Sequence, residues 1–334
     1  MNADSSENGP SPVRAGRYRN PLERFLSRSF KLAPGRHLDP SGVRGYPVDF
    51  AAKALAPSVL PGFVSHPGRH LWVAHIQRAL GSYERWLSGE GEEWLAAARA
   101  AADLLIEHQA SGGAHDGAWV QTAEYPHTFA LRPPWVSGMA QGEGASLLVR
   151  IHGETGEDRY AEAARRALAP LAVPSAEGGA CALLDARPFP EEYPTQPPSF
   201  VLNGAIFALW GLRDVAVGMG DADAGRAFGA GVDALAASIH RWDTGAWSLY
   251  DLYPHRVPNV ASAAYHDLHV VQLEAMAELA PRPELADAAR RFAAYGASRI
   301  NHTRAFARKA LFRVAVPRSR RAAELFPWAG GDPG

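Results

Sequence analysis

The chain has a single cysteine, Cys181, among its 334 residues. One cysteine excludes an intrachain disulfide and a metal site built from cysteines. The chain also lacks excess charge, because its net charge at pH 7 is −1, whereas general nucleic-acid binders normally carry a marked basic excess. No apolar run approaches the length of a membrane span. We therefore expect a protein that binds no nucleic acid and has no membrane span.

The N-terminus has no apolar core either. Residues 1–12 are mostly Asn, Ser, Gly and Pro, which is typical of a disordered leader and not of a secretory signal. We therefore expect a cytoplasmic protein, or one exported by a route that the sequence does not show. We divide it into a disordered or extended leader (1–40), a catalytic domain (41–301) and a basic C-terminal extension (302–334).

The extension is set apart by its charge. Residues 302–321 contain no acidic side chain. Such a run could face an acidic polymer, and a solvated tail is the equal alternative. Its basic residues are His302, Arg304, Arg308, Lys309, Arg313, Arg318, Arg320 and Arg321.

Helical periodicity dominates the rest of the chain, of which 47% is hydrophobic. Apolar residues recur at three- and four-residue spacing between Gly and Pro loops. This predicts an all-α fold, an (α/α) toroid or barrel of antiparallel helix pairs with long loops and a few short β-strands. A compact bundle would not need loops as long as 110–136 or 171–199. The predicted helices are 71–88, 91–109, 137–153, 157–170, 200–217, 221–240, 262–279 and 283–299, and the predicted strands are 180–184 and 247–251.

A proline-stiffened loop, residues 191–199, carries an acidic and phenolic pair ahead of a helix that is apolar nearly all round. Tyr193 precedes Pro194, which disfavours helical geometry at Tyr193, so the loop is expected to be extended. A carboxylate at this place falls at the mouth of a cavity, where burial raises a glutamate pKa. We therefore select Glu192 and Tyr193 as site residues. A solvated acidic turn is the alternative.

Two earlier segments could contact a sugar. Tyr46 precedes Pro47, although a tyrosine beside a proline more often serves packing. Trp135 could offer a flat face to a pyranose. After it, Ser137 is a plausible helix N-cap, and the small residues of 138–144 allow close approach of the backbone, to a ligand or to another helix.

Two later segments are also polar and aromatic. Aromatic and polar residues alternate over 247–254, as expected beside a carbohydrate cleft. In the next predicted helix, Tyr265, His269 and Gln272 share one face, which we expect to line the cleft. His266 and His269 have no evident third ligand, so we predict a hydrogen-bonded pair and no metal site.

Several of these motifs occur together in one known family. Segments 135–150, 191–214, 250–252 and 258–273 have the order and approximate spacing of the catalytic domain of glucuronyl C5-epimerases. The chain resembles that family over roughly residues 90–300, with a weaker echo at Tyr46. The resemblance implies an (α/α) toroid and an isomerase without a cofactor. It also implies inversion of C5 of glucuronate to iduronate within a heparan-type glycan.

By position, the resemblance implies that Glu192, Tyr193, Tyr250 and Tyr265 are the catalytic residues. Glu192 and Tyr265 form the expected proton-transfer pair, with the direction unassigned, and the other two orient the sugar or shuttle protons. The histidines could donate to the substrate carboxylate. The expected substrate-binding residues are Tyr46, Trp135, Gln141, Asn203, Arg256, His266 and His269.

The chain departs from the family in two respects. The family usually has an arginine after Tyr-Asp-Leu, where this chain has Tyr253, and Arg256 is the nearest substitute. Animal members also carry a β-rich domain ahead of the helices, which has no counterpart between Tyr46 and the first long helix. The expected partner is a uronate-containing glycan, and a homodimer is left open.

Two other functions fit the same residues. A polysaccharide lyase or glycoside hydrolase acting on a uronate-containing glycan could use this fold, which does not by itself decide the reaction. A non-catalytic glycan-binding protein would keep the aromatic residues and tolerate the loss of Glu192.

Overall fold

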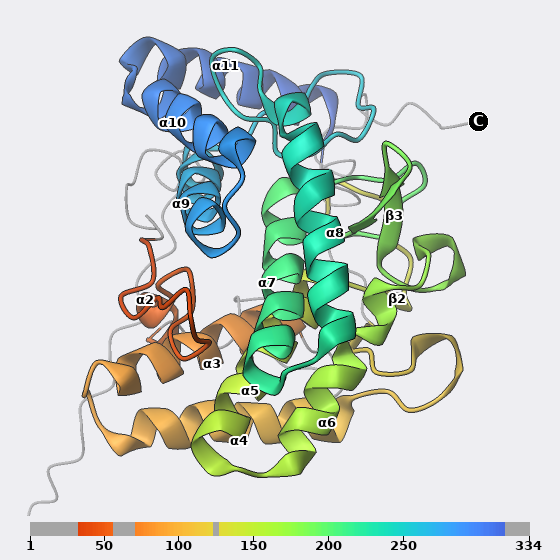
Figure 1. Cartoon of the computed structure of the whole chain (residues 1–334). Helices are drawn as coiled ribbons and strands as arrows, with labels where there is room; N and C mark the ends of the chain where they lie inside the picture. The colour runs from red at the N-terminus through yellow and green to blue at the C-terminus, as the bar shows by residue number, and fades with distance from the viewer. Residues whose placement is uncertain (1–32, 56–70, 123–126, 318–334) are drawn as a thin grey trace, which may run out of the picture. The chain divides into compact units, whose positions relative to one another are not determined.

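The computed structural model describes residues 33–55, 71–122 and 127–317 (Figure 1). Parts of the predicted leader (1–32) and of the predicted extension (318–334) lie outside the described residues. Within the described ranges, no helix is long and apolar enough to cross a lipid bilayer. The helices are α2 (Ala51–Ala54), α3 (Trp72–Leu87), α4 (Glu92–His108), α5 (Gly138–Thr155), α6 (Asp158–Ala167), α7 (Leu202–Met219), α8 (Ala222–Ser238), α9 (Ala263–Leu279), α10 (Pro283–Ala297) and α11 (Arg299–Ala315).

The helices pack as sequence-adjacent pairs, and the all-α prediction is confirmed. Helix α3 packs on α4, α5 on α6, α7 on α8 and α9 on α10, and α7 and α8 lie side by side in Figure 1. The first members of the pairs contact each other in the order α3, α5, α7 and α9. Helices α5 and α7 are buried on almost every side, whereas α6 buries one face. This arrangement of inner and outer helices is that of the predicted (α/α) toroid.

Short antiparallel strand pairs join the helices. Strand β1 (Val120–Gln121) pairs with β2 (Trp135–Val136), and β3 (Cys181–Leu184) pairs with β4 (Arg187–Pro190). The predicted strand at 180–184 is therefore present as β3. The predicted strand at 247–251 was wrong, because this segment makes isolated bridges from Ser248 to Asp243 and from Leu249 to Val260. Pro254 and Pro258 lie in the segment that faces it, and proline has no backbone N–H to extend a ladder.

Helix α11 was not predicted from the sequence. It begins at Arg299 with Ser298 as its N-cap and packs on α9 and α10. Phe312 is fully buried and Lys309 is nearly so. The helical fold therefore continues through the start of the basic run, and Lys309 is not part of a solvated tail.

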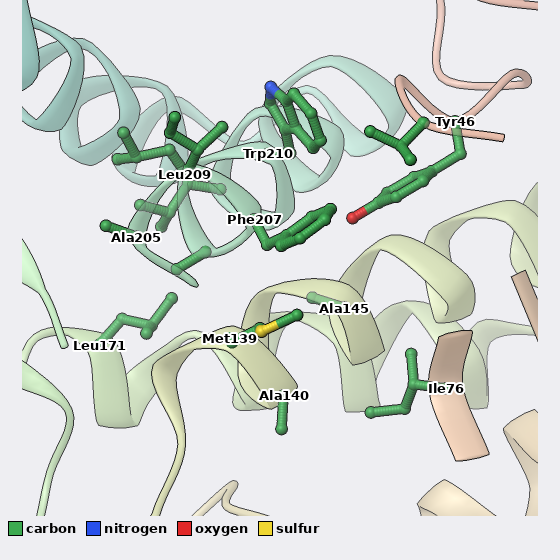
Figure 2. Close-up of a cluster of buried hydrophobic side chains, with 14 of the residues drawn as sticks. Tyr46, Ile76, Met139, Ala140, Ala145, Leu171, Ala205, Phe207, Leu209 and Trp210 are labelled. Carbon is green, nitrogen blue, oxygen red and sulfur yellow. The ribbon is translucent and has the colours of Figure 1, made fainter. Parts of the chain in front are cut away.

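The contact between α5 and α7 depends on glycine. A Cβ added at Gly142 would lie 2.4 Å from the Cα of Ala208, and one added at Gly211 would lie 2.4 Å from the Cα of Gly142. Backbone atoms cannot rotate away as a flexible side chain can. Side chains of both helices, among them Met139 and Phe207, fill the space beside this contact (Figure 2). The small residues after Ser137 therefore serve close helix packing.

We expect Gly142→Ala to lower the free energy of unfolding by about 1–3 kcal/mol, because the two helices must separate. Gly153→Ala in the same helix is the matched control, since a Cβ there meets nothing within 4 Å and alanine is the better helix former by roughly 0.5–1 kcal/mol. Urea denaturation of both variants checks this. Equal effects at the two positions would contradict the packing account.

Candidate functional site

The loop between β4 and α7 is organised around Glu191. This carboxylate is fully buried and accepts hydrogen bonds from Ser199 N (3.0 Å), Ser199 Oγ (2.7 Å) and Phe200 N (2.7 Å). Burial raises the pKa of Glu191 to about 7, against the lowering effect of these donors. Phe200 has a φ of 47°, a left-handed conformation that is uncommon for a bulky residue. Glu191 therefore holds the turn into α7 and has a structural role.

Glu192 lies against the start of α7. It is 5% exposed, and its Oε2 atom has no hydrogen-bond partner among the described residues. A Cβ added at Gly204 would be 2.2 Å from that oxygen, so glycine leaves the space that the carboxyl occupies. Burial raises the pKa of Glu192 to about 8 against the lowering effect of a hydrogen bond with Tyr193, and the nearby charges of Glu191 and Asp251 add to the increase. At neutral pH this carboxyl is therefore mostly protonated.

The three tyrosines that the sequence selected lie near this carboxyl. Tyr250 and Tyr265 meet edge to face at 4.9 Å between ring centres. Burial, followed by the charge of Glu192, raises the pKa of both Tyr193 and Tyr250 well above 10. Tyr265, in the first turn of α9, is 41% exposed. The structure thus gathers the four predicted catalytic residues from three separate segments.

Tyr250 is tied to α7 through the backbone. Its carbonyl oxygen accepts a hydrogen bond from Leu202 N (3.2 Å), and its N–H donates to the carbonyl oxygen of Asn259 (2.7 Å). Leu202 is the first residue of α7. The loop that carries Tyr250 and the helix behind Glu192 are therefore connected directly.

The two histidines of α9 are linked through Ser248. His266 Nε2 lies 2.9 Å from the carbonyl oxygen of Phe292, which can only accept, so this nitrogen carries the proton. Its Nδ1 then accepts from Ser248 N (3.2 Å) and from Ser248 Oγ (2.8 Å). Having donated its proton, Ser248 Oγ accepts from His269 Nδ1 at 2.9 Å. Burial lowers the pKa of His266 to about 4 and that of His269 well below 6.5, so both rings are neutral.

This proton arrangement separates the roles of the two rings. His266 has both nitrogens bonded within the protein and stacks on Trp247 at 3.7 Å between ring centres. His269 is left with an unprotonated Nε2, a buried atom that has no partner in the part of the chain that the structure describes. The sequence suggested that these histidines donate to a substrate carboxylate. Neither ring is placed to do so. His269 offers an acceptor instead.

Two of the expected substrate-binding residues lie in the core. Tyr46 is 1% exposed and packs on Phe50, Phe207 and Trp210 (Figure 2). Gln141 is fully buried, with its amide oxygen accepting from Trp119 N (2.9 Å) and its amide nitrogen donating to two carbonyl oxygens. The contacts of both side chains therefore stabilise the packing of the inner helices.

The other expected binding residues are more dispersed. Trp135 lies 5.8 Å from Tyr193 between ring centres. Asn203 is buried, and its backbone carbonyl oxygen accepts a hydrogen bond from Gln272 Nε2 (3.0 Å). Its side-chain Oδ1 has no hydrogen-bond partner among the described residues. Trp135 and Asn203 therefore adjoin the predicted catalytic residues, whereas the side chain of Arg256 is exposed to solvent.

Within the described ranges, no group of three or more His, Cys, Asp or Glu side chains is arranged to hold a metal ion.

A family model described as the C-terminus of D-glucuronyl C5-epimerase matches residues 93–294. The chain belongs to this family. The matched region contains the four residues of this chain that were predicted to be catalytic. Tyr46 and α11 lie outside it. The resemblance drawn from the sequence motifs is therefore confirmed.

Similar proteins extend the comparison. The chain is 32% identical to a D-glucuronyl C5-epimerase of Caenorhabditis elegans over 214 residues, which is 59% of this chain and 34% of that protein. It is 29% identical to an uncharacterized protein of Methanocaldococcus jannaschii over 46% of this chain and 50% of that protein. The chain thus spans half or less of these relatives. The crystal structure of an unsaturated glucuronyl hydrolase from Bacillus sp. GL1, described as responsible for the degradation of glycosaminoglycan, matches with a TM-score of 0.46 and 16% identity over 67% of this chain and 61% of that chain.

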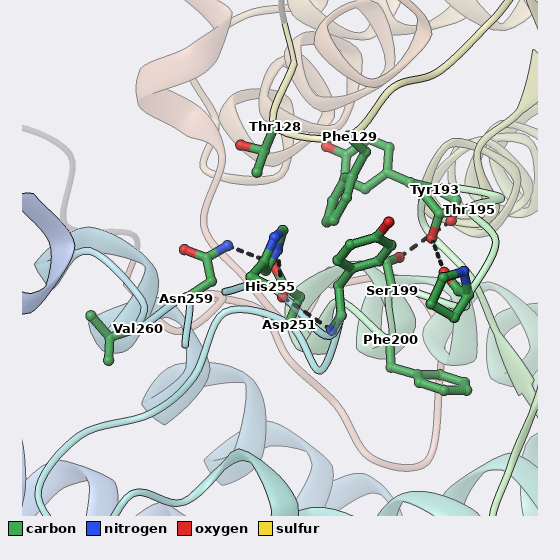
Figure 3. Close-up of polar contacts among 12 residues, drawn as sticks. Thr128, Phe129, Tyr193, Thr195, Ser199, Phe200, Asp251, His255, Asn259 and Val260 are labelled. Carbon is green, nitrogen blue, oxygen red and sulfur yellow. Dashed lines mark hydrogen bonds and ion pairs between the residues drawn. The ribbon is translucent and has the colours of Figure 1, made fainter. Parts of the chain in front are cut away.

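An aromatic wall beside the C5-epimerase motif was missed by the sequence reasoning. His127 lies 4.2 Å and Phe129 lies 5.4 Å from Tyr193 between ring centres, and Phe129 also contacts Tyr253 and His255. Figure 3 shows Phe129, Tyr193 and His255. The loop 110–136 was recognised as long, but no local pattern assigns its residues to Tyr193. The contacts of this wall with Tyr193 are therefore visible only in the structure.

Two buried acidic residues were also missed. Asp251 is 2% exposed, lies 3.2 Å from His255 Nε2 and accepts from Asn259 (Figure 3). Glu143 of α5 is fully buried, accepts from Gln77 Nε2 at 2.8 Å, and has its pKa raised to about 8 by burial. Neither residue lies in a motif that marks it as buried. The interior around Glu192 is therefore richer in carboxyl groups than the sequence indicated.

Proposed function

We propose that this chain is a uronate C5-epimerase, which inverts glucuronate to iduronate, or a related uronic acid pair, within a polysaccharide or oligosaccharide. The observation that carries this proposal is the buried carboxyl of Glu192, with its free Oε2 beside three tyrosines. Membership of the C5-epimerase family supports it. The chain is then an isomerase that acts without a cofactor.

The proposed reaction explains why the acidic side chains of the site should be protonated before the C5 proton is removed. The C5 proton lies α to a carboxylate, so its removal places a second negative charge on the sugar. A mostly protonated Glu192 adds no repulsive charge before the reaction. Tyr193 and Tyr250, whose raised pKa values keep them as phenols, can donate hydrogen bonds to the developing oxyanion.

Inversion needs two groups on opposite faces of the ring. One group takes the C5 proton, the C–H electron pair moves into the carboxylate, and the other group then gives a proton to C5 from the opposite side. We assign these two roles to Glu192 and Tyr265. In the direction in which protonated Glu192 gives the proton, Tyr265 takes the C5 proton as a phenolate. In the reverse direction ionised Glu192 takes the proton and the Tyr265 phenol gives one, as microscopic reversibility requires.

We further propose that His269 accepts a hydrogen bond from a substrate hydroxyl through its unprotonated Nε2. We expect His269→Asn to keep the donor to Ser248 and lose this acceptor, because the asparagine amide nitrogen overlays Nδ1. The binding constant for a uronate oligosaccharide should weaken by about tenfold, while the thermal unfolding temperature stays near that of the wild type. Undiminished binding by a folded variant would remove His269 from the site.

Product analysis tests the proposed reaction. The protein is incubated with glucuronate-containing oligosaccharides, with and without a chelator, and the products are followed by NMR. Iduronate signals that appear equally in both samples support the proposal. An unsaturated uronate would identify a lyase, cleavage to saturated sugars would identify a hydrolase, and an unchanged glycan that still binds would identify a binding protein.

A further inference from the structure

Helix α11 reaches the candidate site from outside the region shared with the family. It runs from Arg299 to Ala315, beyond the matched residues 93–294. We propose that Lys309 of α11 is a positioning residue that fixes Tyr250 in the site. This proposal rests on the role of Tyr250 in the proposed function.

The contacts of Lys309 converge on the loop that carries Tyr250. Its Nζ donates to Asn259 Oδ1 (2.7 Å) and to the carbonyl oxygen of Val260 (2.8 Å). It also lies 5.5 Å from the centre of the Tyr250 ring, a cation–π distance. Because Tyr250 N donates to the carbonyl oxygen of Asn259 and Leu249 bridges Val260, the two arms of this loop pair with each other. Lys309 therefore holds one arm through hydrogen bonds and contacts the ring on the other.

A buried chain of charges explains why a lysine is needed. Asn259 Nδ2 donates to Asp251, the residue directly after Tyr250, so the amide of Asn259 links the ammonium to the carboxylate. The exposed fractions of Lys309, Asn259 and Asp251 are 9%, 2% and 2%. Figure 3 shows Asn259 and Val260 on the same stretch of chain, with Asn259 pointing toward Asp251. Removal of the Lys309 ammonium leaves the carboxylate of Asp251, Asn259 Oδ1 and the carbonyl oxygen of Val260 buried without a cation. Burial of these groups without a cation is strongly unfavourable.

Other residues of α11 contact two further loop residues, His255 and Thr128. Phe312 packs edge to face on His255 at 5.0 Å between ring centres, and Arg313 donates to Thr128 Oγ1 at 2.8 Å. Thr128 neighbours Phe129, which packs on Tyr193. These contacts place α11 against the two loops that flank the tyrosine cluster, but it is Lys309 that reaches Tyr250.

The test compares Lys309→Met with Arg308→Met, an exposed neighbour on the same helix. Protein labelled with ¹³C in its tyrosine rings is followed by NMR, and the signal absent from Tyr250→Phe identifies Tyr250. We expect that signal to shift in Lys309→Met and to stay in place in Arg308→Met. We also expect Lys309→Met to lower C5 exchange by about tenfold to a hundredfold with little further loss when Tyr250→Phe is already present, because the two changes act on one group.

Several outcomes would overturn the proposal. An unmoved Tyr250 signal in folded Lys309→Met would do so, as would losses from Lys309→Met and Tyr250→Phe that add fully. If Lys309→Met does not fold, Asn259→Ser breaks the same link between Lys309 and Asp251, and it must shift the NMR signal of Tyr250. A wild-type protein without C5 exchange would refute the proposed function, and the tyrosine signals would still decide the role of Lys309.

Discussion

Glu192→Gln should abolish most C5 exchange, lowering its rate by about a hundredfold to ten-thousandfold, because the amide cannot carry the transferred proton. The fold should survive, since glutamine has nearly the shape of the protonated carboxyl that fills the space beside Gly204. The rate of deuterium entry at C5 and the circular dichroism spectrum check the two statements. Retained exchange in a folded variant would remove Glu192 from proton transfer.

The same variant should change how stability depends on pH. The pKa of Glu192 is about 8 in the folded protein and about 4.3 in an unfolded chain. Between these values the folded state binds more protons, so the stability of the wild type falls as pH rises through this window. Glu192→Gln lacks this contribution, and its unfolding free energy should fall less between pH 5 and pH 8, by on the order of 1–3 kcal/mol.

Glu191→Gln is the matched neighbour. Glu191 accepts three hydrogen bonds from Ser199 and Phe200, and an amide nitrogen in its place would face at least one of these donors. We expect destabilisation by about 1–3 kcal/mol at pH 5, where both carboxyls are mostly protonated and the lost hydrogen bonds decide the effect. A loss of stability in Glu191→Gln but not in Glu192→Gln at pH 5 would therefore separate two adjacent glutamates, one structural and one functional. If both variants behave alike, this division of roles is wrong.

Tyr265→Phe is the second large effect. We expect loss of C5 exchange by about a hundredfold or more, with almost no change in unfolding temperature, because the side chain is 41% exposed. Tyr295→Phe in α10 is a suitable control, since it removes a hydroxyl that lies 3.5 Å from Asp243 Oδ2. Exchange rates and thermal melts of both variants test this. A Tyr265→Phe protein as active as Tyr295→Phe would contradict the assignment of the second face.

The helices were predictable because their information is local. Apolar spacing and Gly or Pro stops located α3 to α10, and Ser137 caps α5 by accepting from Ala140 N as expected. Helix α11 was not predicted because its run of basic residues was interpreted as a charged C-terminal extension. Burial of Lys309 depends on acceptors about fifty residues earlier in the chain, and no local pattern records such a distant partner.

The site was predictable in its residues but less so in their roles. Glu192 and the tyrosines lie in motifs, and burial then sets their protonation. The roles of His266 and His269 depend on Ser248 and on the carbonyl oxygen of Phe292, which are distant in sequence. Tyr46 resembled a sugar contact locally, yet it packs on Phe207 and Trp210 of the distant helix α7. Long-range contacts therefore decide which polar residues face a substrate.

The most direct test of proton transfer on opposite faces of the sugar ring is the deuterium content of C5 at an early time point in D₂O. Wild-type protein is mixed with a glucuronate oligosaccharide, and C5 of substrate and product is observed by NMR before equilibrium. We predict that the first iduronate formed carries deuterium at C5 while the residual glucuronate still carries hydrogen, because different groups take and give the proton. Iduronate that retains the original hydrogen, or an unsaturated uronate in its place, would contradict the account.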